Sequence, residues 1–256
     1  GVKLMRLLEW YLYQNADRII VLAEGSVGYL KGRWNIPERR ILYLPNGVHI
    51  DNFNYYNEDR ASLRKRYGFN KFTFIYTGAH GPANSLDTIL KAAKRLINHN
   101  NIEFVLVGSG PSKEDLVGQA RLMNLQNVRF MDPVSKSEIP GLLCAADAAI
   151  ITLKDADVFS YAISPNKLFD YMAASKPIIC AIRGDIGSLV EKSGCGITVQ
   201  PENGELLALA VIKVVNSSSE ELEQMGKNGY MLVKNKFSRQ ELVRKLEEAI
   251  QENSNI

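Results

Sequence analysis

Two charged residues at helical spacing, Lys167 and Asp170, are the most chemically suggestive pair in this chain of 256 residues. Ser164 before them suits a helix N-cap, and Pro165 suits the first helical position. An ammonium at the start of a helix reinforces an anion site, and a carboxylate one turn deeper can accept hydrogen bonds from a sugar diol. The alternative is an exposed ion pair worth about 0.2–0.5 kcal/mol.

Glycine-rich loops follow two predicted strands. Gly78-Ala-His-Gly81 leads toward a predicted helix, where glycines and free N–H groups favour a phosphate and His80 adds a hydrogen-bonding group. A tight structural turn is the alternative. The second loop begins at Gly108, but Lys113 stands where a dinucleotide fingerprint needs its third glycine, and the chain has no Walker lysine pattern. Nicotinamide oxidoreductases and P-loop ATPases therefore lose support.

Charge and cysteine usage exclude other classes. The net charge of +3, from 31 basic and 28 acidic residues, is too small and too evenly spread for a nucleic-acid surface. Cys144, Cys180 and Cys195 are odd in number and lack C-x-x-C spacing, so neither a disulfide framework nor a zinc site is favoured. These features predict a cytoplasmic protein. Asp155-Ala-Asp157 has a spacing found in metal sites, but we interpret it as a polar loop.

The elements that position these residues alternate between short apolar strands and longer helices, which predicts an α/β fold with a doubly wound, Rossmann-like parallel sheet. Ligands of such sheets bind outside the carboxyl ends of the strands. The segment 51–66 is polar and strandless, so a linker and domain boundary are expected near 50–60. The expected strands are 18–23, 40–44, 72–77, 102–107, 128–131, 148–152, 177–182 and 196–199, and the expected helices are 26–34, 85–99, 112–123, 136–145, 165–174, 185–193, 204–215, 218–235 and 238–252.

Several ordered motifs resemble one family. Pro45-Asn-Gly-Val-His-Ile-Asp-Asn-Phe53 resembles the hinge of retaining GT-B glycosyltransferases of the group-1, glycogen synthase-like superfamily. The motifs Tyr76-Thr-Gly-Ala-His-Gly81, Val107-Gly-Ser-Gly-Pro111 and Asn127-Val-Arg-Phe130 follow in matching order. With Ser164-Pro-Asn-Lys-Leu-Phe-Asp-Tyr-Met-Ala-Ala-Ser-Lys-Pro177, they are most similar to bacterial transferases of N-acetyl-fucosamine-type residues for surface polysaccharides.

The resemblance implies a site that binds a nucleotide-sugar donor, expected to be a UDP-linked N-acetylated hexose or deoxyhexose. Lys167 and His80 would serve catalysis, and no further cofactor or metal is expected. The other implied roles are diphosphate binding by Gly78, Gly81 and Lys167, ribose binding by Asp170, base binding by Pro133 and Val134, and contact with the transferred sugar by Phe159, Tyr161 and Ser164.

The resemblance also implies a domain plan. Residues 1–52 would be the last elements of an N-terminal acceptor domain plus hinge, 53–237 the donor-binding domain, and 238–256 a C-terminal helix returning to the first domain. Gly1 reads as a cut end. The chain alone would then bind donor without transferring it to its saccharide or lipid-linked acceptor, and peripheral contact with the inner face of the membrane would lie in the missing domain.

Two departures from the family pattern keep alternatives open. Its pair of acids would stand at 162 and 170, but the chain has Ala162 and Asp170. The basic residues usual in the first glycine loop are absent, which leaves Lys167 as the expected diphosphate cation. A nucleotide-sugar epimerase on the same fold, with acid–base groups acting on the sugar, is one alternative. A non-catalytic nucleotide-sugar-binding module is another.

Overall fold

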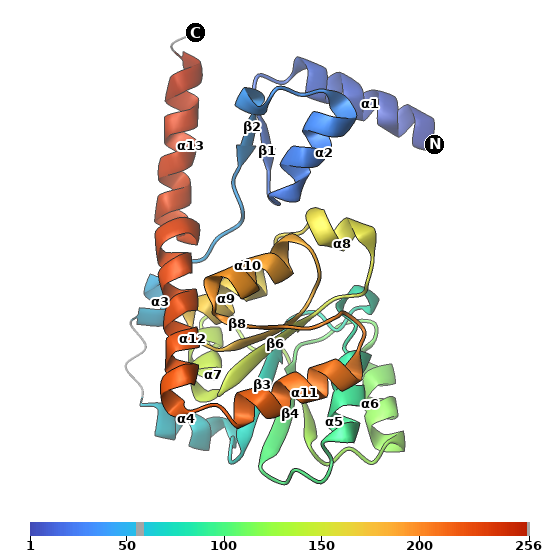
Figure 1. Cartoon of the computed structure of the whole chain (residues 1–256), viewed down its shortest axis with the longest axis vertical. Helices are drawn as coiled ribbons and strands as arrows, with labels where there is room; N and C mark the ends of the chain where they lie inside the picture. The colour runs from blue at the N-terminus through green and yellow to red at the C-terminus, as the bar shows by residue number, and fades with distance from the viewer. Residues whose placement is uncertain (55–58, 255–256) are drawn as a thin grey trace.

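The computed structural model describes residues 1–54 and 59–254, which form a large α/β domain and a small N-terminal unit (Figure 1). The large domain contains a six-stranded sheet in the order β5-β4-β3-β6-β7-β8. Every neighbouring pair is parallel, so the predicted doubly wound sheet is confirmed. Its strands are β3 (Phe72–Thr77), β4 (Ile102–Val107), β5 (Val128–Met131), β6 (Ala148–Thr152), β7 (Ile178–Ala181) and β8 (Gly196–Thr198).

Both faces of the sheet are covered by helices, which explains its nearly continuous apolar strands. Along β3, Phe74 and Tyr76 belong to one core cluster and Ile75 belongs to the other, as the period of two requires. The first cluster includes α5 (Asp87–Arg95), α6 (Lys113–Leu122) and α11 (Gly204–Val215). The second includes α4 (Arg60–Tyr67), α7 (Ile139–Ala145), α9 (Asn166–Ala173) and α10 (Asp185–Ser193).

The C-terminal helices lie along the edge of the domain and then leave it. Helix α12 (Ser219–Leu232) begins at a capping box formed by Ser218 and Glu221. Gly226 of this helix lies so near the turn after α9 that a Cβ there would be 2.1 Å from the Ser175 carbonyl oxygen. A π-helical segment (Val233–Phe237) leads into α13 (Arg239–Ser254), which extends beyond the domain beside the N-terminal unit (Figure 1).

The N-terminal unit has its own small core. Strands β1 (Ile19–Val21) and β2 (Ile41–Tyr43) pair in parallel and pack with α2 (Gly25–Trp34). Helix α1 (Val2–Asn15) has no buried residue, although most of its side chains are apolar. Its exposed large apolar residues are Val2, Leu4, Met5, Leu7, Leu8, Trp10, Tyr11 and Leu12.

The chain passes between the two parts twice, and the two passages lie side by side. Val48 forms an isolated parallel bridge with Ser238, donates its N–H to the Phe237 carbonyl at 3.0 Å, and accepts from the Arg239 N–H at 3.0 Å. Far along α13, Glu252 pairs with Arg18 at 2.9 Å. The bounds 1–52, 53–237 and 238–256 stay predictions, although the turn from large domain to α13 lies at Ser238.

Three short helices differ from the expected pattern. The expected linker contains α3 (Asp51–Asn54) and α4, and Leu63 of α4 is fully buried in the core, so residues 60–67 belong to the large domain. The rest of the expected linker, residues 55–58, lies outside the described residues. Helix α8 (Asp157–Tyr161) stands where we expected only a loop. Helix α4 was missed because it is mostly polar, and α3 and α8 were missed because they have only four and five residues.

Two expectations about the whole chain can be compared with the structure. The three cysteines are free thiols, and Cys180 and Cys195 are buried. Within residues 1–54 and 59–254, no helix has both the length and the apolar character needed to cross a bilayer.

Candidate functional site

The two glycine loops meet at the carboxyl edge of the central strands. Thr77 at the end of β3 pairs with Val107 at the end of β4, so Gly78 and Gly108 stand next to each other. Their φ angles are +138° and +147°, which favours glycine. A Cβ on Gly108 would lie 1.9 Å from the Gly78 carbonyl oxygen, so the loops pack backbone against backbone. This contact needs glycine and shapes the floor of a pocket.

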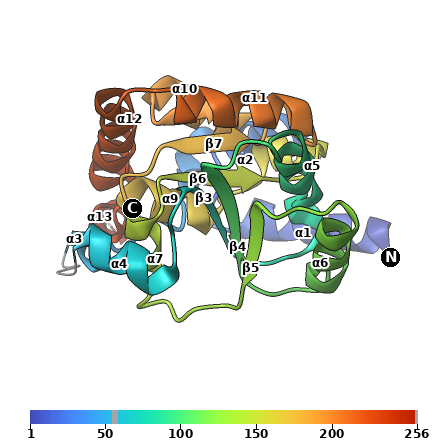
Figure 2. The same ribbon diagram turned by 90° about the horizontal axis from the view of Figure 1, so that it is seen from below.

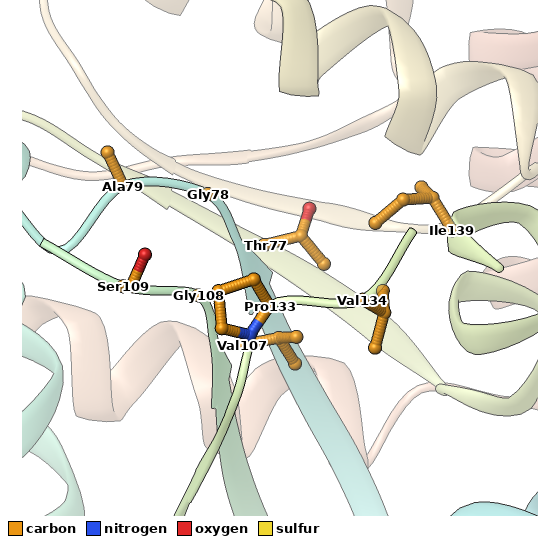
Figure 3. A pocket seen from close by; sticks show the side chains of 9 residues that line it. All are labelled: Thr77, Gly78, Ala79, Val107, Gly108, Ser109, Pro133, Val134 and Ile139. Carbon is orange, nitrogen blue, oxygen red and sulfur yellow. The ribbon is translucent and has the colours of Figure 1, made fainter. Parts of the chain in front are cut away.

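That pocket, here called the glycine-loop pocket, has a volume of about 320 Å³ (Figure 3). Ala79 and Ser109 lie at one end, beside the glycine backbones, and Val134 and Ile139 lie at the other (Figure 3). One end therefore offers main-chain polar groups and the other offers apolar surface. Its lining residues are Thr77, Gly78, Ala79, Val107, Gly108, Ser109, Pro133, Val134 and Ile139.

A second cavity, the α8 pocket, has a volume of about 380 Å³. Its walls are mostly apolar, with a few polar groups that include the Lys167 ammonium and the buried, unpartnered hydroxyl of Ser164. Its lining residues are Asn84, Ile151, Thr152, Leu153, Phe159, Ala162, Ile163, Ser164, Pro165 and Lys167. Phe159 and Ser164 thus line one cavity, and their contact with the transferred sugar stays a prediction.

Lys167 lines one cavity and lies close to the other. It lines the α8 pocket, while its Nζ and Cε lie 3.3 and 3.2 Å from where a Cβ on Gly78 would stand. Nζ donates to the Tyr76 hydroxyl at 2.6 Å and to Asn84 Oδ1 at 2.9 Å, and lies 4.2 Å from the centre of the Tyr76 ring. Burial lowers the pKa of Lys167 to about 8. An ammonium in this position can bind an anion that enters either cavity.

The start of α9 differs by one residue from the prediction. The helix begins at Asn166 with Pro165 as its N-cap in an extended conformation, and no side chain caps it. Ser164 is therefore not the N-cap, because its position before Pro165 turns its hydroxyl into the buried cavity wall instead. Lys167 and Asp170 nevertheless share the first turns of this helix, as predicted.

Asp170 is half-buried, lies one turn further along α9 than Lys167, and lines neither cavity. Burial raises the pKa of its carboxyl to about 6, although the positive charges of Arg239 and Lys136 act in the opposite direction. Its role in ribose binding stays a prediction.

His80 lies behind the glycine loops instead of in a cavity. Its side chain is 0% exposed and its ring lies between Tyr76 and Phe130, with centroid distances of 6.1 and 6.2 Å. Burial and the charges of Lys113 and Lys167 lower its pKa to about 4, so the ring is neutral at pH 7. This position does not support the expected direct catalytic role.

The backbone of His80 does connect the two glycine loops. Its N–H donates to the Ser109 carbonyl at 2.8 Å, and its carbonyl accepts from the Ser112 N–H at 2.9 Å. Gly81 faces away from the glycine-loop pocket into a different cavity, and a 3-10 turn (Pro82–Asn84) separates it from α5. Gly78 is thus better placed than Gly81 to bind a phosphate.

The remaining sugar-facing candidate, Tyr161, points to the N-terminal unit. Its ring stacks on Tyr29 of α2 with centroids 6.0 Å apart. Beside this pair, Asp185 accepts a hydrogen bond from the Gly25 N–H at 2.7 Å. Tyr161 therefore joins the two parts of the molecule, whereas Phe159 of the same short helix faces the α8 pocket.

The Asp155-Ala-Asp157 pair is bound by a cation from the chain itself. Arg183 forms ion pairs with both carboxylates, at 2.6 Å to Asp157. In the ranges that the structure describes, no group of three or more His, Cys, Asp and Glu side chains is arranged to hold a metal ion. The pair is accordingly part of an exposed polar cluster.

Tyr76 and Asn84 are site residues that sequence reasoning missed. Tyr76 reads as an apolar strand residue, and Asn84 reads as part of a loop. Their contact with Lys167 joins positions 91 and 83 residues apart, so no local spacing could indicate it.

The sequence of this chain is similar to those of known glycosyltransferases. The family model described as Glycosyl transferases group 1 matches residues 71–217, a range that contains the whole six-stranded sheet. The chain is 24% identical over 215 residues to "Probable glycosyltransferase WbjE" of Pseudomonas aeruginosa, covering 83% of this chain and 53% of that protein. It is 26% identical over 203 residues to "Putative colanic acid biosynthesis glycosyl transferase WcaI" of Escherichia coli, covering 77% and 49%.

The chain thus spans about half the length of these curated relatives. Among solved structures, Anabaena HepE in complex with UDP and glucose superposes with a TM-score of 0.77 at 19% identity. That match covers 96% of this chain and 65% of the other. It shows a common fold.

Proposed function

The chain belongs to the family of group-1 glycosyl transferases, and on this premise we propose that it binds a nucleotide-sugar donor across its two connected cavities. The observation that carries the proposal is the buried Lys167 ammonium between the glycine-loop pocket and the α8 pocket. Among the described residues, it has no carboxylate partner. A diphosphate that joins a nucleoside to a sugar would supply its counter-ion.

The nucleoside would occupy the glycine-loop pocket. Pro133 and Val134 offer an apolar surface for a base, and Asp170 of the neighbouring α9 would bind the ribose. The diphosphate would lie against the backbone of Gly78, within reach of Lys167. These assignments keep the order base, ribose and diphosphate along one line from the apolar to the polar end.

The donor sugar would occupy the α8 pocket. Its walls at Leu153, Phe159, Ala162 and Ile163 suit a methyl-bearing group, so we propose a UDP-linked N-acetylated hexose or deoxyhexose. Anabaena HepE, with the same fold, was crystallised with UDP-glucose, which supports uridine as the base. A donor of this chemistry also agrees with the resemblance to N-acetyl-fucosamine-type transferases.

The reaction would proceed by departure of the nucleoside diphosphate. Breaking the glycosidic bond to phosphate builds negative charge on the leaving group, and a fixed ammonium and main-chain N–H groups in a partly dry site stabilise that charge. Lys167 would act in this way. We propose no cofactor beyond the donor, and retention of the anomeric configuration rests on the family resemblance.

The acceptor is proposed to be a saccharide or lipid-linked saccharide, because the name of WcaI refers to colanic acid biosynthesis. Since the chain covers about half of such relatives, we propose that transfer by residues 1–256 alone is weak. We also propose a cytoplasmic location. Contact with the inner face of the membrane would then be made by other parts of the protein.

Titration calorimetry with UDP and uridine tests the proposal. We expect Lys167→Ala to weaken UDP binding about tenfold or more, the loss of roughly 1.5–3 kcal/mol for a charged hydrogen bond, and to leave uridine nearly unchanged. Asp170→Asn should weaken both ligands, because both carry the ribose. Lys192→Ala, an exposed position on α10, is the matched control. No heat with millimolar UDP, or equal loss of both ligands in Lys167→Ala, would contradict the assignment.

One observation favours an alternative function. Ala162 in the α8 pocket provides no acid toward the sugar, which suits a non-catalytic nucleotide-sugar-binding module. UDP release by a longer form of the protein, measured with and without saccharide acceptor, separates the candidates. A transferase releases UDP only with acceptor, a binding module never does, and an epimerase interconverts UDP-sugars without release.

A further inference from the structure

The Lys167 side chain is half-buried, and the hydrogen-bonding groups around its ammonium are electrically neutral, which is unusual for a lysine withdrawn from water. Its hydrogen-bond acceptors are the Tyr76 hydroxyl and Asn84 Oδ1. Across residues 1–54 and 59–254, no carboxylate lies within ion-pairing distance of Nζ. Withdrawing a charge from water without a counter-ion costs free energy, and the two neutral hydrogen bonds to Lys167 offset this cost only in part.

Each partner is itself held in place. The Tyr76 ring is 0% exposed in the core, and its hydroxyl donates to the Ala79 carbonyl at 2.9 Å, which directs the oxygen lone pairs to Nζ. The carbonyl of Asn84 accepts from the Thr152 hydroxyl at 2.6 Å, which fixes the backbone of that turn to β6. Strand β3, the turn before α5 and strand β6 therefore jointly determine where the ammonium lies.

We infer that Tyr76 and Asn84 are positioning residues that hold the Lys167 ammonium between the two cavities without neutralising it, which reserves its charge for the donor diphosphate. This inference rests on the proposed function. A carboxylate at either position would fix the ammonium equally well but would compete with the ligand. Neutral acceptors therefore fix the position of the Lys167 ammonium without cancelling its charge.

The variant Asn84→Asp is the most direct test, because it keeps the side-chain shape and adds a competing negative charge. UDP affinity should fall about tenfold, the effect of ~1.4 kcal/mol, whereas uridine affinity should stay within about twofold. The folded protein should be at least as stable as the wild type in urea. Asn166→Asp, which adds the same charge at an exposed position one residue before Lys167, should change UDP affinity by less than about threefold.

The second variant, Tyr76→Phe, keeps the buried ring and removes the hydroxyl. The number of protons taken up with UDP at pH 8, obtained from binding enthalpies in buffers of different ionisation heat, distinguishes positioning from a structural role. Wild-type protein should take up a fraction of a proton, because burial lowers the pKa of Lys167 to about 8 and the diphosphate raises it again. Uptake should increase in Tyr76→Phe, which loses an acceptor, and nearly vanish in Asn84→Asp.

The outcomes separate this inference from the proposed function. If wild-type protein does not bind UDP, the proposed function fails. If it binds UDP and Asn84→Asp binds equally well, or loses uridine to the same extent, the positioning role is refuted while the proposed function stands. Unchanged proton uptake in both variants would also refute it.

Discussion

At the scale of single residues, the site combines two half-buried charges whose pKa values are shifted toward each other. Burial lowers the pKa of Lys167 to about 8 and raises that of Asp170 to about 6. The two side chains share one helix at the spacing of an ion pair, yet they form none in the described structure. Neither charge is neutralised by the other, and each carries its own pH dependence.

The shifted pKa of Asp170 predicts weaker nucleoside binding in acid. A ribose diol donates hydrogen bonds, so the carboxyl must be ionised to accept both. Uridine affinity should fall roughly tenfold between pH 7.5 and pH 5, since a pKa of about 6 leaves about a tenth of the carboxyl ionised at pH 5. Calorimetric titrations at both pH values measure this change. Asp170→Asn should bind more weakly with little pH dependence, and an unchanged pH slope in that variant would exclude Asp170 as the cause.

The Asp170 carboxyl also makes the stability of the folded protein depend on pH. Its pKa in the folded protein lies above the unfolded value of 3.8, so the folded state binds the proton more tightly. Its stabilising contribution is complete below pH 3.8 and is lost as the pH rises through about 6. Ligand binding and stability thus respond to this carboxyl in opposite directions.

Sequence reasoning identified part of this residue-level arrangement. The i, i+3 spacing of Lys167 and Asp170 was enough to place them on one helix, since such spacing is local. It failed for His80, whose burial depends on Phe130 from another strand, and for Tyr76, whose hydroxyl meets a side chain 91 positions away. Polarity in a sequence does not reveal burial when the surrounding side chains come from distant segments.

At the scale of elements, glycines in helix interiors mark where backbones approach. In α12, a Cβ at Gly226 would meet the Ser175 carbonyl, whereas a Cβ at Gly118 in α6 would have nothing within 4 Å. Both positions carry the same intrinsic helix penalty of about 1 kcal/mol relative to alanine. Comparing alanine substitutions at Gly118 and Gly226 therefore separates the effect of helix packing from that of helix propensity.

We predict opposite effects of alanine at these two sites. Gly118→Ala should raise the free energy of unfolding by about 0.5–1 kcal/mol. Gly226→Ala should lower it by about 1–3 kcal/mol, because α12 must move away from the turn after α9. Urea unfolding followed by circular dichroism measures both. A stabilised Gly226→Ala would show that α12 does not pack as described.

The large-domain strands were predicted nearly residue by residue, because a sheet covered on both faces produces short apolar runs. β3 and β4 have the expected bounds, and β7 is shorter than expected by one residue at each end. Helix α4 was missed because only Leu63 of its eight residues is buried, which leaves no apolar periodicity to detect. Its fold depends on packing against α7, a tertiary contact.

At the scale of the whole molecule, the N-terminal unit touches the large domain beside the α8 pocket. Gly25 makes this contact possible, since a Cβ there would lie 2.5 Å from both Asp185 Oδ2 and the Tyr161 Cβ. Tyr161 is the last residue of α8, and Phe159 of that helix lines the pocket. The position of the N-terminal unit is therefore connected to one wall of the proposed sugar site.

We predict that Gly25→Ala separates the two parts. The added methyl group should displace α2, increase the radius of gyration in small-angle X-ray scattering and remove the Tyr29–Tyr161 stack, while uridine affinity stays within about twofold. Gly28→Ala on the same helix has nothing within 4 Å of its Cβ and should leave the scattering unchanged. Identical scattering curves for wild type and Gly25→Ala would contradict this contact in solution.

The hydrogen-bonded segments at Val48 and Ser238 limit how the N-terminal unit and the large domain can move relative to each other. Two segments that are hydrogen-bonded along one line resist sliding and twisting, but they permit rotation about that line, which acts as a hinge axis. Helix α13 continues from this line beside the N-terminal unit (Figure 1), and the view from below shows α12 and α13 at the same edge of the large domain (Figure 2). We therefore expect relative motion of the parts to have a single rotational degree of freedom, in which a small turn at Val48 becomes a large displacement at Tyr29.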